Sequence, residues 1–156
     1  MEIKEILTRR LEGEALANVL GFVDYLLGKG LTLKKEWDSG FRFVKNDKSP
    51  CLIVLTKNPQ NIEDWFICDI PVASEPEWDS LNDDLKEFII SNIKTCNVHE
   101  GSPCGCGSEP GVSKNIFGKV YNNVCTSEIQ LIFPKPDVLD KFKEIIEWWI
   151  VNIGDK

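Results

Sequence analysis

Residues 31–55 read LTLKKEWDSGFRFVKNDKSPCLIVL, and this stretch decides the fold. Apolar and polar residues alternate over 31–37, which is the pattern of a half-buried strand. The turn-forming residues 38–40 predict a hairpin into a second alternating strand over 41–45. Residues 51–55 are apolar throughout and predict a central strand that is covered on both faces. The stretch therefore indicates three consecutive strands with short connections.

A fourth strand and two preceding helices complete the N-terminal part of the prediction. Residues 65–70 read WFICDI and end at Pro71, so we expect them to close a four-stranded antiparallel meander. Apolar residues recur at helical spacing over 3–12 and 14–27. Gly13 either separates two helices or lies inside one long helix.

The second half of the chain predicts a helix, a loop and a hairpin. A helix capped by Asn82 or Asp83 is expected to run directly into Cys96. Residues 97–113 are rich in Gly, Ser and Pro and predict a loop. The apolar segments that follow predict a second hairpin, with strands over 116–121 and 128–133.

These elements indicate an α+β fold. Pro136 and Asp137 suit the first turn of a final amphipathic helix. We expect an antiparallel sheet of about 5–6 strands, a four-strand meander plus a C-terminal hairpin, with helices packed mainly on one face. No repeat or linker divides the sequence, so residues 1–156 are interpreted as a single α+β domain.

Composition limits the classes of partner and compartment. The chain has 156 residues and a net charge of −7, which argues against nucleic acid and anionic membranes as partners. The charged N-terminus lacks the apolar core of a signal peptide, and no apolar run approaches the ~20 residues of a membrane span. We therefore expect a cytoplasmic location. Thiols are normally reduced there, so the six cysteines predict core residues, metal ligands or reactive thiols.

One cluster of cysteines carries the chemistry. Cys96, His99, Cys104 and Cys106 are followed by Cys125, and His99 is the only histidine of the chain. Thiolate and imidazole are the ligands that zinc prefers in four-coordinate structural sites. We therefore predict a zinc-binding loop, with five candidate ligands for four positions.

Two other interpretations of the cysteines stay open. Cys104 and Cys106 form a Cys-Gly-Cys pair that would suit a thiol redox protein. Free cysteines are also common as small core residues, and Cys51 and Cys68 are assigned to the core because they lie in apolar strands. Cys125, beside an apolar residue, is open to the same interpretation.

The aromatic residues of the meander suggest a different function. Trp37, Phe41, Phe43 and Trp65 are expected on one sheet face, where they would line a small-molecule pocket or lie in the core beneath the helices. The core interpretation is preferred. The identity of a small-molecule ligand does not follow from the sequence.

The final helix offers a surface for self-association. Successive helical positions are about 100° apart, so Trp149 joins the apolar stripe while Trp148 is expected to be partly exposed at a homodimer contact. No recognisable catalytic motif is present, which favours a protein that is not an enzyme.

The C-terminal part also resembles a known group of proteins. Residues 115–125 read NIFGKVYNNVC, follow a helix that ends in Cys96, and precede a helix opened by Pro136 and Asp137. This arrangement resembles a family of small uncharacterised cysteine-containing bacterial proteins from anaerobic Firmicutes over roughly residues 82–150. The family's cysteines are more compactly spaced and its activity is not established. The resemblance therefore implies that four cysteines matter without naming a reaction: Cys96, Cys104, Cys106 and Cys125.

Overall fold

The structure, a computed structural model, describes residues 2–58, 60–96 and 111–156. The chain divides into two compact units, which are considered separately. The first unit comprises Met1–Ile67 and Leu131–Lys156, and the second comprises Cys68–Gln130. The expected single domain over 1–156 stays a prediction.

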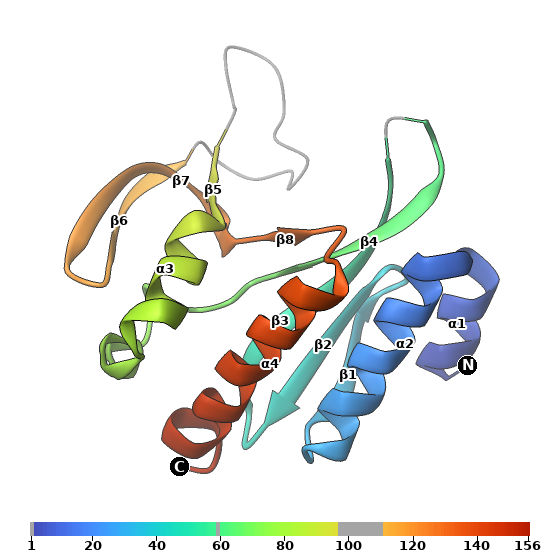
Figure 1. The fold of residues 1–156 in the computed structure, drawn as a ribbon, viewed down its shortest axis with the longest axis horizontal. Helices are drawn as coiled ribbons and strands as arrows, with labels where there is room; N and C mark the ends of the chain where they lie inside the picture. The colour runs from blue at the N-terminus through green and yellow to red at the C-terminus, as the bar shows by residue number, and fades with distance from the viewer. Residues whose placement is uncertain (1, 59, 97–110) are drawn as a thin grey trace. The chain divides into compact units, whose positions relative to one another are not determined.

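The first unit is built on a five-stranded antiparallel sheet in the order β1-β2-β3-β4-β8 (Figure 1). The strands are β1 Thr32–Trp37, β2 Gly40–Lys45, β3 Lys48–Lys57, β4 Glu63–Cys68 and β8 Leu131–Ile132. The first four follow one another in sequence and in space, so the predicted meander and the α+β fold class are confirmed.

The register of the meander explains its buried face. Phe43 pairs with Cys51 and Phe41 pairs with Ile53, so all four side chains point to one side of the sheet, where they are buried. The turn between β2 and β3 uses Asn46 and Asp47, both with positive φ, which matches the right-handed twist of the two strands.

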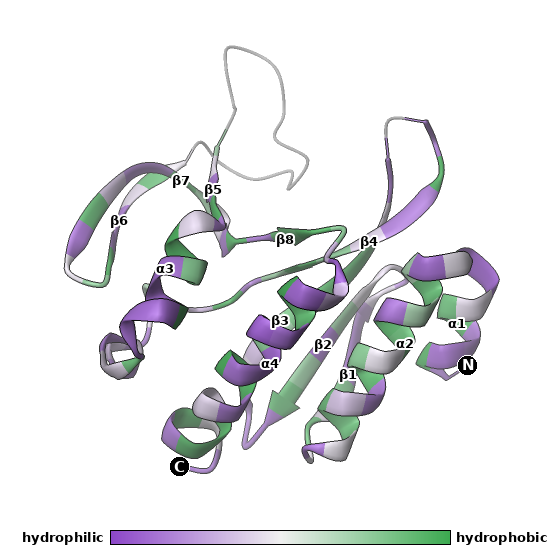
Figure 2. Ribbon diagram, in the orientation of Figure 1, coloured by the Kyte–Doolittle hydropathy of each residue, from purple (hydrophilic) through white to green (hydrophobic). Residues whose placement is uncertain are grey.

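Three helices cover one face of this sheet: α1 Ile3–Arg10, α2 Gly13–Gly28 and α4 Pro136–Trp149 (Figure 1). Gly13 has a φ of 58°, so it separates α1 from α2 in a conformation that favours glycine. The hydrophobic residues of α2 and α4 alternate with hydrophilic ones along each helix (Figure 2). The ring of Phe22 in α2 lies 6.4 Å from Trp65 and 5.8 Å from Phe142, centroid to centroid.

The aromatic side chains of the meander are distributed between core and surface. Phe41, Phe43 and Trp65 are buried, which confirms the preferred interpretation that they belong to the core. Trp37 departs from the expectation, because it is 48% exposed. Its indole lies against Gly40, where any side chain would collide with the ring.

The C-terminal helix is oriented as its spacing predicts. Trp149 is fully buried and Trp148 is half-buried. A short π-helix, η2 Ile150–Gly154, continues α4, and Gly154 lies so close to Trp149 that a Cβ there would come within 2.6 Å of the indole. The homodimer contact expected at this helix stays a prediction.

The second unit contains a separate three-stranded sheet in the order β5-β7-β6. Its elements are the 3-10 helix η1 Pro76–Ser80, α3 Asp83–Ser91, β5 Ile93–Thr95, β6 Val112–Ile116 and β7 Lys119–Ile129. Asn82 caps α3, since its side-chain oxygen accepts the N–H of Leu85 at 2.9 Å. This contact decides between the two candidate caps.

The predicted C-terminal hairpin is wrong in its turn and in its sheet. The structure turns at Phe117 and Gly118, both with positive φ, so β6 pairs with β7 in the second unit. Asn123, where the sequence suggests a turn, forms a left-handed bulge inside β7. The segment after residue 130 leaves this sheet, and β8 pairs with β4 instead.

The predicted continuous helix into Cys96 is also wrong. α3 ends at Ser91, and the side chain of Asn92 donates to the carbonyl of Phe88 at 2.7 Å, which satisfies a helix-end carbonyl. Residues 93–95 then form strand β5, in keeping with the β-branched Ile93 and Thr95.

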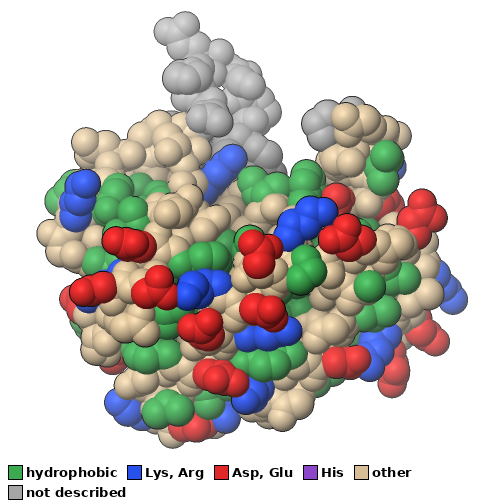
Figure 3. Space-filling model, viewed as in Figure 1, with side chains coloured by type: hydrophobic (Ala, Val, Ile, Leu, Met, Phe, Trp, Pro, Cys, Tyr) green, Lys and Arg blue, Asp and Glu red, His purple; other side chains and the backbone are tan. Residues whose placement is uncertain are grey.

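Charge is distributed without segregation on the surface that Figure 3 draws. Acidic and basic side chains are interspersed with hydrophobic ones over this face. In the part of the chain that the structure describes, no helix is both long enough and apolar enough to cross a membrane. The expectation that nucleic acid is not a partner continues to rest on the net charge of −7.

The cap of α3 leads to a first prediction. Replacing Asn82 with Ala removes the acceptor for the Leu85 N–H and should lower the free energy of unfolding by about 1 kcal/mol. Asn82→Asp keeps an acceptor at this position and should remain near the wild-type value. Urea denaturation measures both, and an Ala variant as stable as the Asp variant would show that the cap contributes nothing.

Candidate functional site

Both sides of the cysteine-rich segment 97–110 are attached to strand β7, and we call this attachment point the base of the segment. Val124 in β7 pairs with Thr95 of β5 on one side and with Val112 of β6 on the other. The described residues on either side of segment 97–110 are thus attached to the same point of the sheet. The chain leaves and re-enters this small sheet beside one residue.

The two sides of the segment touch directly at Cys96 and Gly111. A Cβ on Gly111 would lie 2.6 Å from the Cβ of Cys96 and 2.7 Å from the side-chain oxygen of Asn123, so only glycine fits there. The N–H of Cys96 donates to the carbonyl of Asn123 at 2.7 Å. The Asn123 side chain donates back to the carbonyl of Cys96 at 2.6 Å. These contacts fix the place where the segment begins and ends.

Two of the five predicted ligands are described, and both lie at this base. Because β5 and β7 are antiparallel and Thr95 pairs with Val124, Cys96 and Cys125 lie one position to either side of this pair, diagonal to each other across the two segments. Both are buried, with 2% and 1% of their surface exposed. The other three candidates, His99, Cys104 and Cys106, lie outside the described residues.

The two described thiols fit part of a metal site. Cysteine sulfur is a preferred ligand in four-coordinate structural zinc centres. Within residues 2–58, 60–96 and 111–156, however, no three His, Cys, Asp or Glu side chains gather closely enough to hold a metal ion. Cys96 and Cys125 would therefore need ligands from the segment between them.

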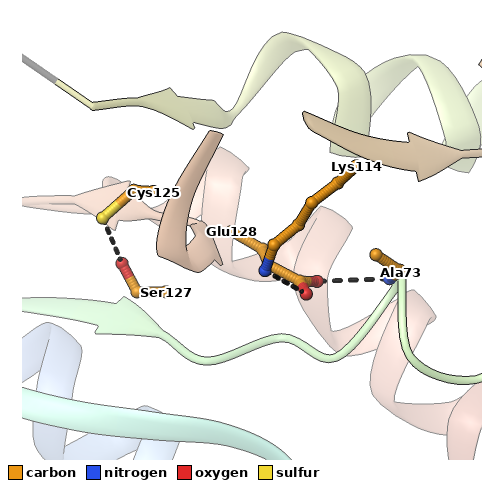
Figure 4. Close-up of polar contacts among 5 residues, drawn as sticks. All are labelled: Ala73, Lys114, Cys125, Ser127 and Glu128. Atoms are coloured by element: carbon orange, nitrogen blue, oxygen red, sulfur yellow. Dashed lines mark hydrogen bonds and ion pairs between the residues drawn. The ribbon is translucent and has the colours of Figure 1, made fainter. Parts of the chain in front are cut away.

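Cys125 belongs to a buried polar network that the sequence did not suggest. Its Sγ lies 3.4 Å from the Oγ of Ser127, which is also buried (Figure 4). The side-chain amide of Gln130 donates to the same Oγ at 2.7 Å. Ser127 thus connects the thiol to a fixed hydrogen-bond donor.

Glu128 is the second polar residue buried in β7. Its carboxylate forms an ion pair with the Nζ of Lys114 at 2.7 Å and accepts the N–H of Ala73 at 3.2 Å (Figure 4). Its φ is 53°, an uncommon value for a residue with a side chain. These two contacts hold the carboxylate, and with it this backbone conformation, in place.

The conformation of Glu128 changes which side chains share a face. In a regular strand, Ser127 and Gln130 would point to opposite faces because they are three positions apart. The left-handed residue between them interrupts the alternation, and the side chain of Gln130 reaches Ser127. No sequence pattern marks a glutamate that adopts positive φ, so sequence reasoning missed this network.

The remaining described cysteines are core residues, as predicted. Cys51 and Cys68 are buried in β3 and β4. Burial raises the pKa of the Cys51 thiol to about 12, and the charge of Arg42 opposes this only in part. A thiol with such a pKa stays protonated near neutral pH and is unreactive.

Comparison with known proteins identifies no relative. No protein-family model, curated protein or solved structure matches the chain. The resemblance over residues 82–150 stays a prediction. The chemistry of the site follows from its own geometry.

Each charge of the Lys114–Glu128 ion pair should stabilise the other, because both side chains are largely removed from water. The two side chains are only 18% and 8% exposed, so Glu128→Gln leaves a poorly hydrated lysine unpaired and should cost about 2 kcal/mol of unfolding free energy. Adding Lys114→Met removes the second charge and should restore part of that loss. Lys119→Met, at an exposed lysine, is the control. A double variant less stable than Glu128→Gln would contradict this account.

Cys51 should make stability depend on pH in the alkaline range. The folded chain holds this proton more tightly than the unfolded chain, whose thiol has the ordinary pKa of about 9. Its contribution is therefore complete below about pH 9 and falls as the pH rises toward 12. Denaturation of wild type and Cys51→Ala from pH 8 to 11 should show a shrinking difference in unfolding free energy. A constant difference would contradict the raised pKa.

Proposed function

We propose that the chain is a metal-binding protein whose cysteine-rich segment 96–125 holds one zinc ion. The observation that carries this proposal is the pairing of Val124 with both Thr95 and Val112. This pairing brings the two sides of segment 97–110 together beside Cys125. A segment whose two sides are already held together loses less conformational entropy than a free chain when its ligands gather around one metal ion.

The type and burial of the ligands favour zinc in a structural role. Cys96 and Cys125 are soft sulfur donors, and the other candidates are His99, Cys104 and Cys106. The two described thiols are almost completely buried, which suits a closed centre better than a site that admits substrate. A reducing cytoplasmic compartment, part of the same proposal, would keep the thiols available as ligands.

A metal would also meet a structural need of the small sheet. Short strands contribute few pairing contacts, and a bound metal can act as a cross-link in a small sheet. β5 has three residues and β6 has five. A zinc ion bound to Cys96 and Cys125 would cross-link β5 to β7 near the bulge at Asn123.

Two alternative functions follow from other features of the sequence. A thiol redox function depends on Cys104 and Cys106, which lie outside the described residues. A small-molecule pocket depends on the aromatic residues of the meander, of which Phe41, Phe43 and Trp65 are buried in the core. Both alternatives stay predictions.

Elemental analysis tests the proposed zinc site. Protein purified without a metal-binding tag should contain about one zinc per chain, and Cys96→Ser or Cys125→Ser should lower that content. Cys51→Ala removes a buried thiol from the first unit and should leave the zinc content unchanged. Wild-type protein that binds no transition metal, with every thiol free to react after unfolding, would refute the proposal.

A further inference from the structure

A chain of hydrogen bonds ends on the sulfur of Cys125. We propose that Ser127 and Gln130 are positioning residues that supply a hydrogen bond to this sulfur when it is a metal ligand. The inference rests on the proposed zinc site and names the residues that determine its affinity. Each residue in it is described by the structure.

The direction of the chain follows from the chemistry of its ends. The Gln130 Nε2 group can only donate, so the Ser127 Oγ accepts at 2.7 Å. The hydroxyl hydrogen of Ser127 then remains available for the Cys125 Sγ, 3.4 Å away. A metal-bound thiolate carries no hydrogen, so Ser127 must be the donor in the bound state.

The backbone conformation around Glu128 holds Gln130, Ser127 and Cys125 in the positions that these hydrogen bonds need. Positive φ at Glu128 brings Gln130 to the face of Ser127, and the contacts with Lys114 and Ala73 hold Glu128 in place. The backbone N–H of Gln130 donates to the carbonyl of Asn92 at 3.1 Å, which fixes the far end of the chain. The positive φ of Glu128 and its ion pair with Lys114 therefore both help to keep the Gln130 side chain beside Ser127.

A hydrogen bond to a ligand sulfur orients it and stabilises its negative charge. Partners of this kind typically change metal affinity by about 10-fold to 100-fold. Cys125 is 1% exposed, so water has little access to replace Ser127 as the donor. The effect should therefore be visible when the hydroxyl is removed.

The test measures Co²⁺ and Zn²⁺ affinity by competition with a chelator, together with the thiolate-to-cobalt absorption bands. Ser127→Ala should bind about 10-fold more weakly and shift these bands, whereas Ser127→Thr, which keeps the hydroxyl, should recover most of the affinity. Ser113→Ala, at an exposed serine of β6 in the same sheet, is the matched control and should leave both unchanged.

Gln130→Glu gives the sharper test because it reverses the chain. A carboxylate accepts the Ser127 hydroxyl hydrogen and turns it away from Cys125, so affinity should fall although a negative charge has been added. Simple attraction of the cation predicts the opposite sign. Gln130→Glu should have no such weakening effect when residue 127 is already Ala. Tighter binding by the single Gln130→Glu variant would overturn the proposed chain.

The outcomes separate this inference from the zinc proposal. Wild-type protein that binds neither Co²⁺ nor Zn²⁺ refutes the zinc site, and the positioning roles with it. Wild-type protein that binds metal, with Ser127→Ala equal to Ser113→Ala in affinity and spectrum, refutes the positioning roles alone. The half-buried Gln130 tolerates a near-isosteric change, so its variant remains informative if Ser127→Ala does not fold.

Discussion

The second unit depends on the pairing of one strand, β7, on both of its edges. Val124 lies between Thr95 and Val112, so the chain leaves and re-enters the sheet beside the same residue. Gly111 approaches Cys96 closely because the two backbone segments that flank residues 97–110 lie side by side at this point. Cys96 and Cys125, the two described members of the cysteine cluster, both lie beside this point.

Much of the first unit could be predicted because its elements follow from local periodicity. Alternation over residues 31–45 marks two strands, and the apolar run at 51–55 marks the buried third. The turn residues at 38–40 mark the boundary between the first two strands, whereas Gly13 left one helix or two open until its positive φ was seen. The exposure of Trp37 could not be predicted, because it depends on a bulge in β1 and on the lack of a side chain at Gly40, against which the indole lies.

The candidate site was predictable only in composition. Cys96 and Cys125 stand out among the residues by type, but their placement on either side of the Thr95–Val124 pair follows from the register of β5 and β7. This register could not be predicted, since the expected hairpin turned between strands over 116–121 and 128–133, whereas the true turn uses Phe117, an unusual residue for positive φ. The network around Glu128 leaves no trace in the sequence, because it depends on a backbone conformation that glutamate rarely adopts.

The central claim is that the sulfur atoms of this cluster bind a metal ion together. X-ray absorption at the zinc edge, on protein isolated from zinc-supplemented cells, measures the ligand type directly. The account predicts a four-coordinate shell dominated by sulfur at about 2.3 Å, reduced by one sulfur when Cys125 is replaced with Ser. A shell of oxygen and nitrogen alone, unchanged by that replacement, would contradict it.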